Sequence, residues 1–231
     1  DLERAYEALN NITKGKDRIN ATEIIYKEIL LSPAQSKAYS DVKTGMAKGK
    51  PVMLNGVTGS GKTEIYMKLA QECLDQGHNV LYLVPEIALS RQLEDRLYEQ
   101  FGETLLTFHS GETAAARMNT TESVRESEVL KSNYILLGTR SSLFLPHNNL
   151  GLVIVDEEHD NSYKQDSPAP RYNGRDTALM LHRIHNCGIV LGSATPSLEE
   201  IYNCRFGKHK MVQLKERFHG SEASDIEIID T

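Results

Sequence analysis

Tryptophan is absent from these 231 residues, aromatic residues make up only 6%, and cysteine occurs three times. Cys73, Cys187 and Cys204 are odd in number and widely separated, and no CxxC pair occurs. This pattern argues against a disulfide framework or a metal site, and we expect the three cysteines to be small buried hydrophobic residues. No apolar run approaches the roughly 20 residues that a membrane-spanning helix needs, so we expect no membrane partner.

An excess of positive charge is also lacking. The formal net charge is −6, and the proportions of hydrophobic (39%) and charged (25%) residues are those of an ordinary soluble globular protein. This charge argues against nucleic-acid binding by bulk attraction, although a few well-placed Lys or Arg side chains can still contact phosphates. The first residues, DLERAYEALN, are charged and lack the apolar core of a signal peptide, so we expect a cytoplasmic location.

From residue 51 onward, short apolar runs alternate with helical patterns. The runs predict six buried strands, at Val52–Leu54, Val80–Val84, Leu105–Phe108, Tyr134–Leu137, Leu152–Val155 and Ile189–Leu191. Helices are clearest at Thr63–Gln76 and Leu89–Phe101, and Ser32-Pro33 predicts a helix start for a segment that runs to Ala47. Apolar strands separated by helices predict an α/β fold, with a mostly parallel sheet covered by helices on both faces.

Other segments break this rhythm. Gly111–Asn133 predicts a surface helix plus loop, and Asp160–Asp176 a long loop. Past Gly207 the alternation is lost, and Ile226–Ile229 predicts a strand or linker leading elsewhere. We therefore expect residues 1–30 to be a linker or the tail of an upstream domain, residues 31–210 to form one lobe, and residues 211–231 to connect toward another.

A phosphate-binding loop follows the first strand. GVTGSGKT fits the pattern GxxxxGK[ST], between a strand and a helix as that motif requires. Its glycines let backbone N–H groups point at phosphate oxygens beside a helix N-terminus. The bland alternative is a glycine-rich turn. Lys62 is expected to reach the β- and γ-phosphates, and Thr63 to ligate Mg²⁺. The predicted nucleotide-binding residues of this loop are Gly56, Val57, Thr58, Gly59, Ser60, Gly61, Lys62 and Thr63.

A cluster of acids follows the strand Leu152–Val155. Asp156, Glu157 and Glu158 are adjacent there, and they would repel one another unless a cation lay nearby. Asp156 is predicted to hold Mg²⁺, and Glu157 to act as the general base for the attacking water, with Lys62 completing the catalytic set. An acidic solvated turn is the alternative, which the neighbouring phosphate loop disfavours.

DEEH after an apolar strand, together with GVTGSGKTE, resembles a superfamily 2 helicase. LVPEIAL, GTRS and GSATP resemble its motifs Ia, Ib and III in the same order. The sequence is further similar to the family of bacterial replication-restart helicases (PriA, primosomal protein N′), on the segments GVTGSGKTEIY, LVPEIAL, FHSG, GTRSSLFLP, NLGLVIVDEEHDNSYKQ and LGSATPSLE. The resemblance covers residues 31–231.

This resemblance implies a RecA-like first motor lobe of a 3′-to-5′ DNA helicase that uses ATP and Mg²⁺. It implies that Gln35 reads adenine, and that His159, Ser193 and Thr195 couple the nucleotide site to motif III. The implied partners are forked and single-stranded DNA, a second helicase lobe, single-stranded-DNA-binding protein and primosome proteins. Zinc is expected only in a part of the full-length protein outside this chain.

DNA contacts are also implied by the resemblance. Residues 160–176 correspond to an aromatic-rich loop, in which Tyr163 and Tyr172 would stack on bases while Lys164 and Arg171 pair with phosphate or with the acidic cluster. The tryptophan common in that loop is absent here, which puts the strength of stacking in doubt. The remaining predicted DNA contacts are Pro85, Thr139 and Arg140, although a surface ion pair is the alternative for the arginine.

Too few residues follow Pro196 for a second lobe, which would supply an arginine finger. Such a finger contributes about 10³–10⁵ in rate, so this fragment alone is expected to hydrolyse ATP slowly. Two other functions remain open. One is a different superfamily 2 translocase, RecG-like or restriction-type. The other is a nucleotide-regulated DNA-binding module without turnover, which the presence of both Lys62 and Glu157 disfavours.

Overall fold

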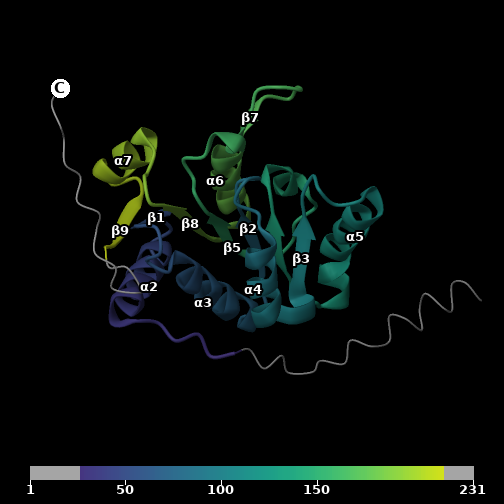
Figure 1. Ribbon diagram of the computed structural model, residues 1–231, viewed down its shortest axis with the longest axis horizontal. Helices are drawn as coiled ribbons and strands as arrows, with labels where there is room; N and C mark the ends of the chain where they lie inside the picture. Colours follow the sequence, from purple (N-terminus) through teal and green to yellow (C-terminus); the bar gives the residue numbers. More distant parts are fainter. Residues whose placement is uncertain (1–26, 216–231) are drawn as a thin grey trace, which may run out of the picture.

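A computed structural model of the chain describes residues 27–215, which form a sheet with helices on both faces (Figure 1). The sheet has seven strands, every neighbouring pair of which is parallel. Their order is β3 (Leu105–Phe108), β4 (Ile135–Gly138), β2 (Asn79–Leu83), β5 (Leu150–Val155), β8 (Gly188–Ser193), β1 (Val52–Gly56) and β9 (Lys210–Leu214). The predicted α/β fold with a parallel sheet is confirmed, and the six predicted strands lie within two residues of their expected bounds.

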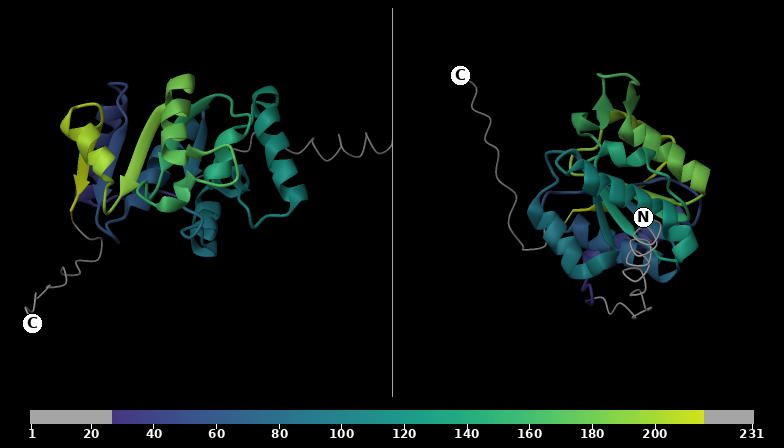
Figure 2. Two further views of the ribbon diagram at one scale, coloured as in Figure 1. Left: turned by 90° about the horizontal axis from the view of Figure 1, so that it is seen from above. Right: turned by 90° about the vertical axis from the view of Figure 1, so that its right-hand side faces the viewer.

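Two hydrophobic layers sandwich the sheet. Within β2, Val80 and Tyr82 face the layer of α2 (Pro33–Met46), α3 (Lys62–Asp75) and α4 (Arg91–Phe101). Leu81 and Leu83 face the opposite layer, to which α5 (Ala114–Leu130) and α6 (Gly174–His185) contribute. Both faces of each central strand are therefore buried, which explains why the strands are apolar without alternation. Figure 2 shows the two helical layers from above and from one end.

Side-chain caps start most of the helices. At α2 the Ser32 hydroxyl accepts the Gln35 N–H at 3.2 Å, and the Gln35 carbonyl oxygen Oε1 accepts the Ser32 N–H at 2.8 Å. Pro33 then occupies the first helical position. This capping box satisfies two N–H groups that a helix end leaves without partners. Side chains also cap α4, α5, α6 and α7 (Leu198–Arg205), at Ser90, Thr113, Asn173 and Ser197.

The expectation that the α/β rhythm ends past Gly207 is wrong. Strand β9 pairs in parallel with β1 from Val52↔Lys210 to Gly56↔Leu214, and Val212 and Leu214 are buried. The lobe therefore extends beyond the predicted boundary at residue 210. The strand was missed because Lys210 and Gln213 interrupt its apolar pattern, as suits the outer position of β9. Residues 226–229, predicted as a strand or linker, lie outside the described residues.

The prediction of a long loop is also wrong for the segment Asp160–Asp176. It contains a 3₁₀ turn (Asn161–Tyr163), then an antiparallel hairpin of β6 (Lys164–Gln165) and β7 (Tyr172–Asn173), and α6 already begins at Gly174. The hairpin projects from the body of the lobe beyond α6 (Figures 1 and 2). Strands of two residues leave no periodic signal in a sequence. The predicted surface helix in residues 111–133 is confirmed as α5.

The start of the lobe lies slightly earlier than predicted. Gln100 on α4 donates a hydrogen bond to the backbone oxygen of Lys27 at 2.8 Å, and Ile29 packs partly against the core. Residues 27–30 therefore contact the lobe, whereas residues 1–26 lie outside the described part of the chain. All three cysteines are free thiols, with Cys73 and Cys187 buried. No helix within residues 27–215 combines the length and apolarity needed to cross a membrane.

Candidate nucleotide site

The phosphate-binding loop and the acidic cluster meet at one edge of the sheet. The loop leaves the carboxyl end of β1, and Asp156 leaves the carboxyl end of β5, with β8 between the two strands. Together they line a cavity of 330 Å³, to which α4 adds one residue; its lining is Val57, Thr58, Gly59, Ser60, Gly61, Lys62, Thr63, Glu64, Arg96, Asp156 and Glu157. Nearly all the residues predicted to bind and hydrolyse nucleotide are thus brought together.

The loop geometry requires glycine at two positions. Gly59 and Gly61 have φ angles of +76° and +81°, a region that side chains disfavour. A Cβ atom on Gly61 would also lie 2.0 Å from the Gln35 amide nitrogen. The loop therefore curls tightly against the start of α2. This curl, at the N-terminus of α3, is the arrangement that binds phosphate through backbone N–H groups.

Lys62 is the cation of the site. It is 8% exposed, its ammonium donates to the Gly56 oxygen at 2.9 Å, and it lies 3.6 Å from the Glu157 carboxylate. A phosphate in the cavity would meet this ammonium directly. The placement of Lys62 between the loop and the acidic cluster fits the predicted role of neutralising phosphate charge.

Asp156 is a buried carboxyl group beside a second acid. Burial and the neighbouring Glu157 charge raise the pKa of the Asp156 carboxyl to about 6, although Lys62 opposes this shift. The Asp156 oxygen Oδ1 accepts hydrogen bonds from the Tyr66 hydroxyl at 3.2 Å and from the Glu157 N–H at 3.1 Å. A divalent cation would relieve the repulsion between the two carboxylates. The residues present therefore fit Mg²⁺, with Thr63 on the same cavity wall.

Glu157 adopts an unusual backbone conformation. Its φ angle is +46°, which is rare for residues other than glycine and is found at functional sites. The conformation directs its carboxylate between Lys62, at 3.6 Å, and His159 Nδ1, also at 3.6 Å. The carboxylate is partly exposed to the cavity. It is therefore placed to accept a proton from a water molecule beside the phosphates.

His159 connects the acidic cluster to the end of β8. Its Nδ1 atom is hydrogen-bonded to the Ser193 hydroxyl at 2.8 Å, and its Nε2 atom lies 3.3 Å from the Thr195 hydroxyl. The three residues predicted to couple the nucleotide site to the GSATP segment are thus in direct contact. Their coupling role stays a prediction.

Gln35 is committed to protein partners in this structure. Its amide nitrogen donates to the Ser60 and Gly61 backbone oxygens at 3.3 Å each, while its carbonyl oxygen belongs to the capping box. The side chain is 1% exposed. Gln35 therefore ties α2 to the phosphate-binding loop, and the predicted contact with adenine stays a prediction.

The DEAD/DEAH box helicase model matches residues 32–204, most of the chain and all of the site above. The chain belongs to the DEAD/DEAH box helicase family. Curated relatives include replication restart protein PriA of Rickettsia felis, 46% identical over 78% of this chain and 27% of that protein. PriA of Bacillus subtilis is 37% identical over 78% of this chain and 22% of that protein. The chain spans about a quarter of the length of these relatives.

Solved helicase structures share the fold. A structure of RecG bound to a three-way DNA junction superposes with a TM-score of 0.57 at 19% identity, covering 82% of this chain and 24% of RecG. The helicase MrfA bound to DNA and AMPPNP gives a TM-score of 0.55 at 22% identity, covering 81% of this chain and 27% of that one. At these identities the likeness establishes the fold alone, which is that of a RecA-like helicase lobe.

The predicted DNA contacts in and beside the hairpin differ in how accessible they are. Lys164 and Arg171 on the hairpin are exposed and free to meet phosphate. Tyr172 is partly buried, with its ring edge-on to Phe144 at 4.9 Å. The Arg140 guanidinium donates to the backbone oxygens of Ser162, at 2.6 Å, and Lys164, at 3.1 Å. The arginine therefore supports the base of the hairpin rather than forming the surface ion pair considered as its alternative.

The stacking role assigned to Tyr163 is wrong in this structure. The side chain is 1% exposed, and its hydroxyl donates to the Asp156 backbone oxygen at 2.7 Å, so neither ring face can reach a base. The predicted contacts of Pro85 and Thr139 with DNA are wrong as well. Both are buried, proline has no N–H, and the Thr139 N–H is donated to the Phe108 oxygen at 3.3 Å. Backbone amides at these two positions are therefore unavailable to phosphate.

Tyr66, one helical turn after Lys62, was missed from the sequence. It is fully buried on α3, packs edge-on against Tyr82 with ring centroids 5.6 Å apart, and orients Asp156 through its hydroxyl. Room for this hydroxyl depends on Gly192, where a Cβ atom would lie 1.6 Å from it. A tyrosine on the apolar face of a helix needs a hydrogen-bond partner, and that was the available signal.

We expect Gly192→Ala to destabilise the lobe by about 1–3 kcal/mol, because the added methyl group overlaps the Tyr66 hydroxyl. Combining it with Tyr66→Phe should recover part of this loss, because the phenylalanine ring lacks the hydroxyl oxygen that clashes most severely, while its Cζ atom still lies 2.8 Å from the added Cβ. Thermal unfolding of both single variants and the double variant measures the coupling between them. Simple additivity of the two single effects would show that the predicted overlap does not control stability.

Proposed function

We propose that the chain is the ATP-binding first motor lobe of a PriA-type helicase, which hydrolyses ATP to translocate on and unwind DNA at stalled replication forks. The observation that carries the proposal is the shared cavity of the phosphate-binding loop, Lys62, Asp156 and Glu157 at one sheet edge. Identity of 46% to PriA of Rickettsia felis supports the assignment to replication restart rather than to another translocase.

Each residue then has a defined part in hydrolysis. The loop N–H groups and Lys62 bind the phosphates, and Thr63 with Asp156 would hold Mg²⁺. Bound Mg²⁺ would neutralise charge that develops on the phosphate oxygens. Glu157 accepts the proton of the attacking water, and its carboxylate is held between Lys62 and His159. His159, Ser193 and Thr195 pass the state of the nucleotide to the segment after β8.

The projecting hairpin supplies the DNA-facing side of the proposal. Exposed Lys164 and Arg171 provide phosphate contacts, and partly exposed Tyr172 provides an aromatic ring on which an unpaired base stacks. We further propose a second lobe with an arginine finger, forked and single-stranded DNA, single-stranded-DNA-binding protein and primosome proteins as partners. The location proposed is the bacterial cytoplasm at the nucleoid.

The test is ATP turnover by the full-length gene product, with and without forked DNA. We expect forked DNA to stimulate turnover and the fork to be unwound in the same reaction. Blunt duplex DNA of equal length serves as the control substrate. ATP turnover at the same rate with and without DNA would contradict the proposal and favour a nucleotide-regulated module. Stimulation without unwinding would favour a translocase of another kind.

The 231-residue fragment alone is expected to turn ATP over about 10³–10⁵-fold more slowly than the full-length protein on DNA, because the proposed second lobe would supply the arginine finger and Arg96, which lines the cavity, is paired with Glu64. Steady-state hydrolysis by the two proteins at equal concentration measures the difference. Adding DNA should not raise the ATP turnover of the fragment to that of the full-length protein. Rates for the fragment comparable to those of the full-length protein would show that this lobe contains a complete site.

A further inference from the structure

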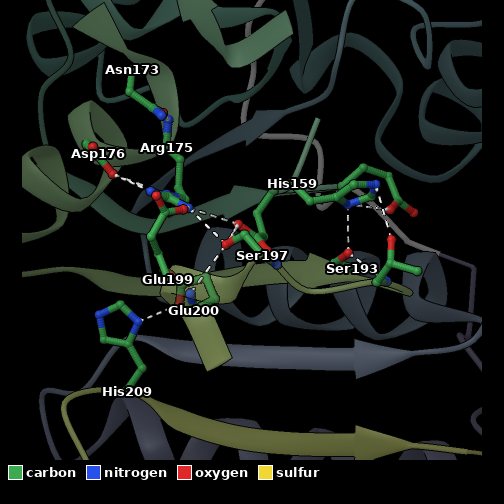
Figure 3. A network of polar contacts seen from close by, with 12 residues as sticks. His159, Asn173, Arg175, Asp176, Ser193, Ser197, Glu199, Glu200 and His209 are labelled. Atoms are coloured by element: carbon green, nitrogen blue, oxygen red, sulfur yellow. Dashed lines mark hydrogen bonds and ion pairs between the residues drawn. The ribbon is translucent and has the colours of Figure 1, made fainter. Parts of the chain in front are cut away.

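Arg175 connects three segments that are far apart in the sequence. It is the second residue of α6, directly after the hairpin, and it is 8% exposed. One of its nitrogens, Nη1, donates to the Glu158 carboxylate at 3.3 Å, the Ser197 hydroxyl at 3.0 Å and the Glu199 carboxylate at 3.2 Å. Figure 3 shows this side chain between Asp176 on its own helix and the first residues of α7.

Glu158 is the second centre of the same network. Its side chain is fully buried, and Arg175 is its only ion-pair partner within residues 27–215. The Glu158 carboxylate also accepts the Ser197 N–H at 2.7 Å and the Ser197 hydroxyl at 3.0 Å. Burying a carboxylate without such a set of donors would cost free energy. The position of Glu158 is therefore fixed jointly by α6 and by the start of α7.

The network joins segments next to the proposed general base, next to the contact of His159 with Thr195, and next to the hairpin. Glu158 follows the proposed general base, Glu157, in the sequence. Ser197 lies two residues after Thr195, which contacts His159. Arg175 lies two residues after the hairpin strand β7. A displacement of the hairpin that moves the start of α6 must therefore affect the contacts of Arg175 with Glu158 and Ser197. Either these contacts break, or the two segments that carry Glu158 and Ser197 move as well.

We infer that Arg175 is a positioning residue that couples the DNA-facing hairpin to the nucleotide site, by holding Glu158 and Ser197 in one arrangement. The inference rests on the proposed function and adds the route by which DNA is sensed. A guanidinium presents several donors in a rigid fork, so one side chain contacts Glu158, Ser197, Glu199 and Asp176 at once. A lysine ammonium is a single point charge and cannot reproduce that set.

The experiment uses the full-length gene product and two variants. Arg175→Lys keeps a positive charge beside Glu158 but loses the fork. The double variant Arg175→Met with Glu158→Gln removes both charges, so no buried carboxylate is left unpaired. Arg183→Lys, an exposed position on the same helix, is the matched control. Thermal unfolding confirms that each protein is folded.

Two readouts separate coupling from general damage. The first is ATP turnover with and without a single-stranded oligonucleotide, with kcat and KM for ATP determined in both conditions. The second is the affinity for the same labelled oligonucleotide with and without a non-hydrolysable ATP analogue. Linkage requires the two sites to influence each other's binding by the same factor.

We expect DNA stimulation to fall by about 5- to 50-fold in both Arg175 variants, within the usual range of coupling between sites. DNA-free kcat and KM for ATP should stay near the wild-type values, and DNA affinity should lose its dependence on nucleotide. Wild-type coupling in either folded variant would overturn the inference, as would an equal fall of the DNA-free and DNA-stimulated rates. A wild-type protein that DNA does not stimulate would instead overturn the proposed function, and the inference with it.

Discussion

Replacing Glu157 with glutamine is expected to lower ATP turnover of the full-length protein by about 10²–10⁴-fold, the usual contribution of a positioned general base. Glutamine keeps the size of the side chain but accepts no proton. Nucleotide affinity should stay equal or rise, because Lys62 loses its anionic neighbour at 3.6 Å and is left free to meet phosphate. Single-turnover hydrolysis and binding of a fluorescent ATP analogue measure the two effects separately.

The matched control is Glu128→Gln, an exposed glutamate on α5 remote from the cavity. It should change neither rate nor affinity. Hydrolysis that survives in the Glu157 variant would show that another group activates the water. A parallel loss of affinity would mean that Glu157 holds the phosphate-binding loop rather than acting on water.

Replacing Asp156 with asparagine should have opposite effects on activity and stability. Hydrolysis should fall by at least about 10²-fold, because the variant loses a carboxylate that we propose holds Mg²⁺. The charge of this cation would stabilise the transition state. The ligand-free lobe, in contrast, should become more stable above pH 6. Burial and the Glu157 charge raise the pKa of Asp156 from 3.8 to about 6, so the ionised form is disfavoured in the folded protein.

The sign of the pH dependence follows from this shift. Between pH 4 and pH 6 the folded state binds more protons than the unfolded state, so the stability of the wild-type lobe falls as the pH rises through that window. The penalty is complete above pH 6. Asparagine removes it, and we expect a gain of about 1–2 kcal/mol at pH 7 that disappears near pH 4.

Thermal unfolding of the wild type and the Asp156→Asn variant from pH 4 to pH 8, without nucleotide or Mg²⁺, checks this expectation. Adding Mg²⁺ with a non-hydrolysable ATP analogue should reverse the order of stability, because only the wild type retains the carboxylate that binds the cation. A stability difference between the two proteins that does not vary with pH would show that repulsion at Asp156 is not its source.

Much of the fold followed from local patterns. The central strands are apolar on both faces, so each stood out as a short uninterrupted run, and Ser32-Pro33 marked the start of α2. The elements that sequence reasoning missed lack such signals. Strand β9 is broken by polar residues at the sheet edge, and the hairpin strands span two residues each. Helix α6 begins inside the segment interpreted as a loop, and no helix was predicted at the position of α7.

The nucleotide site was predictable because its chemistry is concentrated in two contiguous motifs. Tyr66 and Arg175 could not be found in this way. Their roles arise from contacts with Asp156 and Glu158, which lie at the end of another strand. Tyr163 shows the reverse error. An aromatic residue beside basic ones fits a stacking platform, but only the folded structure reveals that this ring is buried in the hydrophobic core.

Strand β9 also moves the open edge of the sheet one strand away from the nucleotide site. With β9 in place, the strand that feeds the phosphate-binding loop has a partner on each side. A chain ended before Lys210 would leave β1 at the margin of the sheet, with a row of unsatisfied N–H and C=O groups and the apolar residues Val52–Leu54 beside them. Such a margin is a template for pairing with a further strand. The five residues of β9 thus keep the strand that leads into the phosphate-binding loop away from the open edge of the sheet.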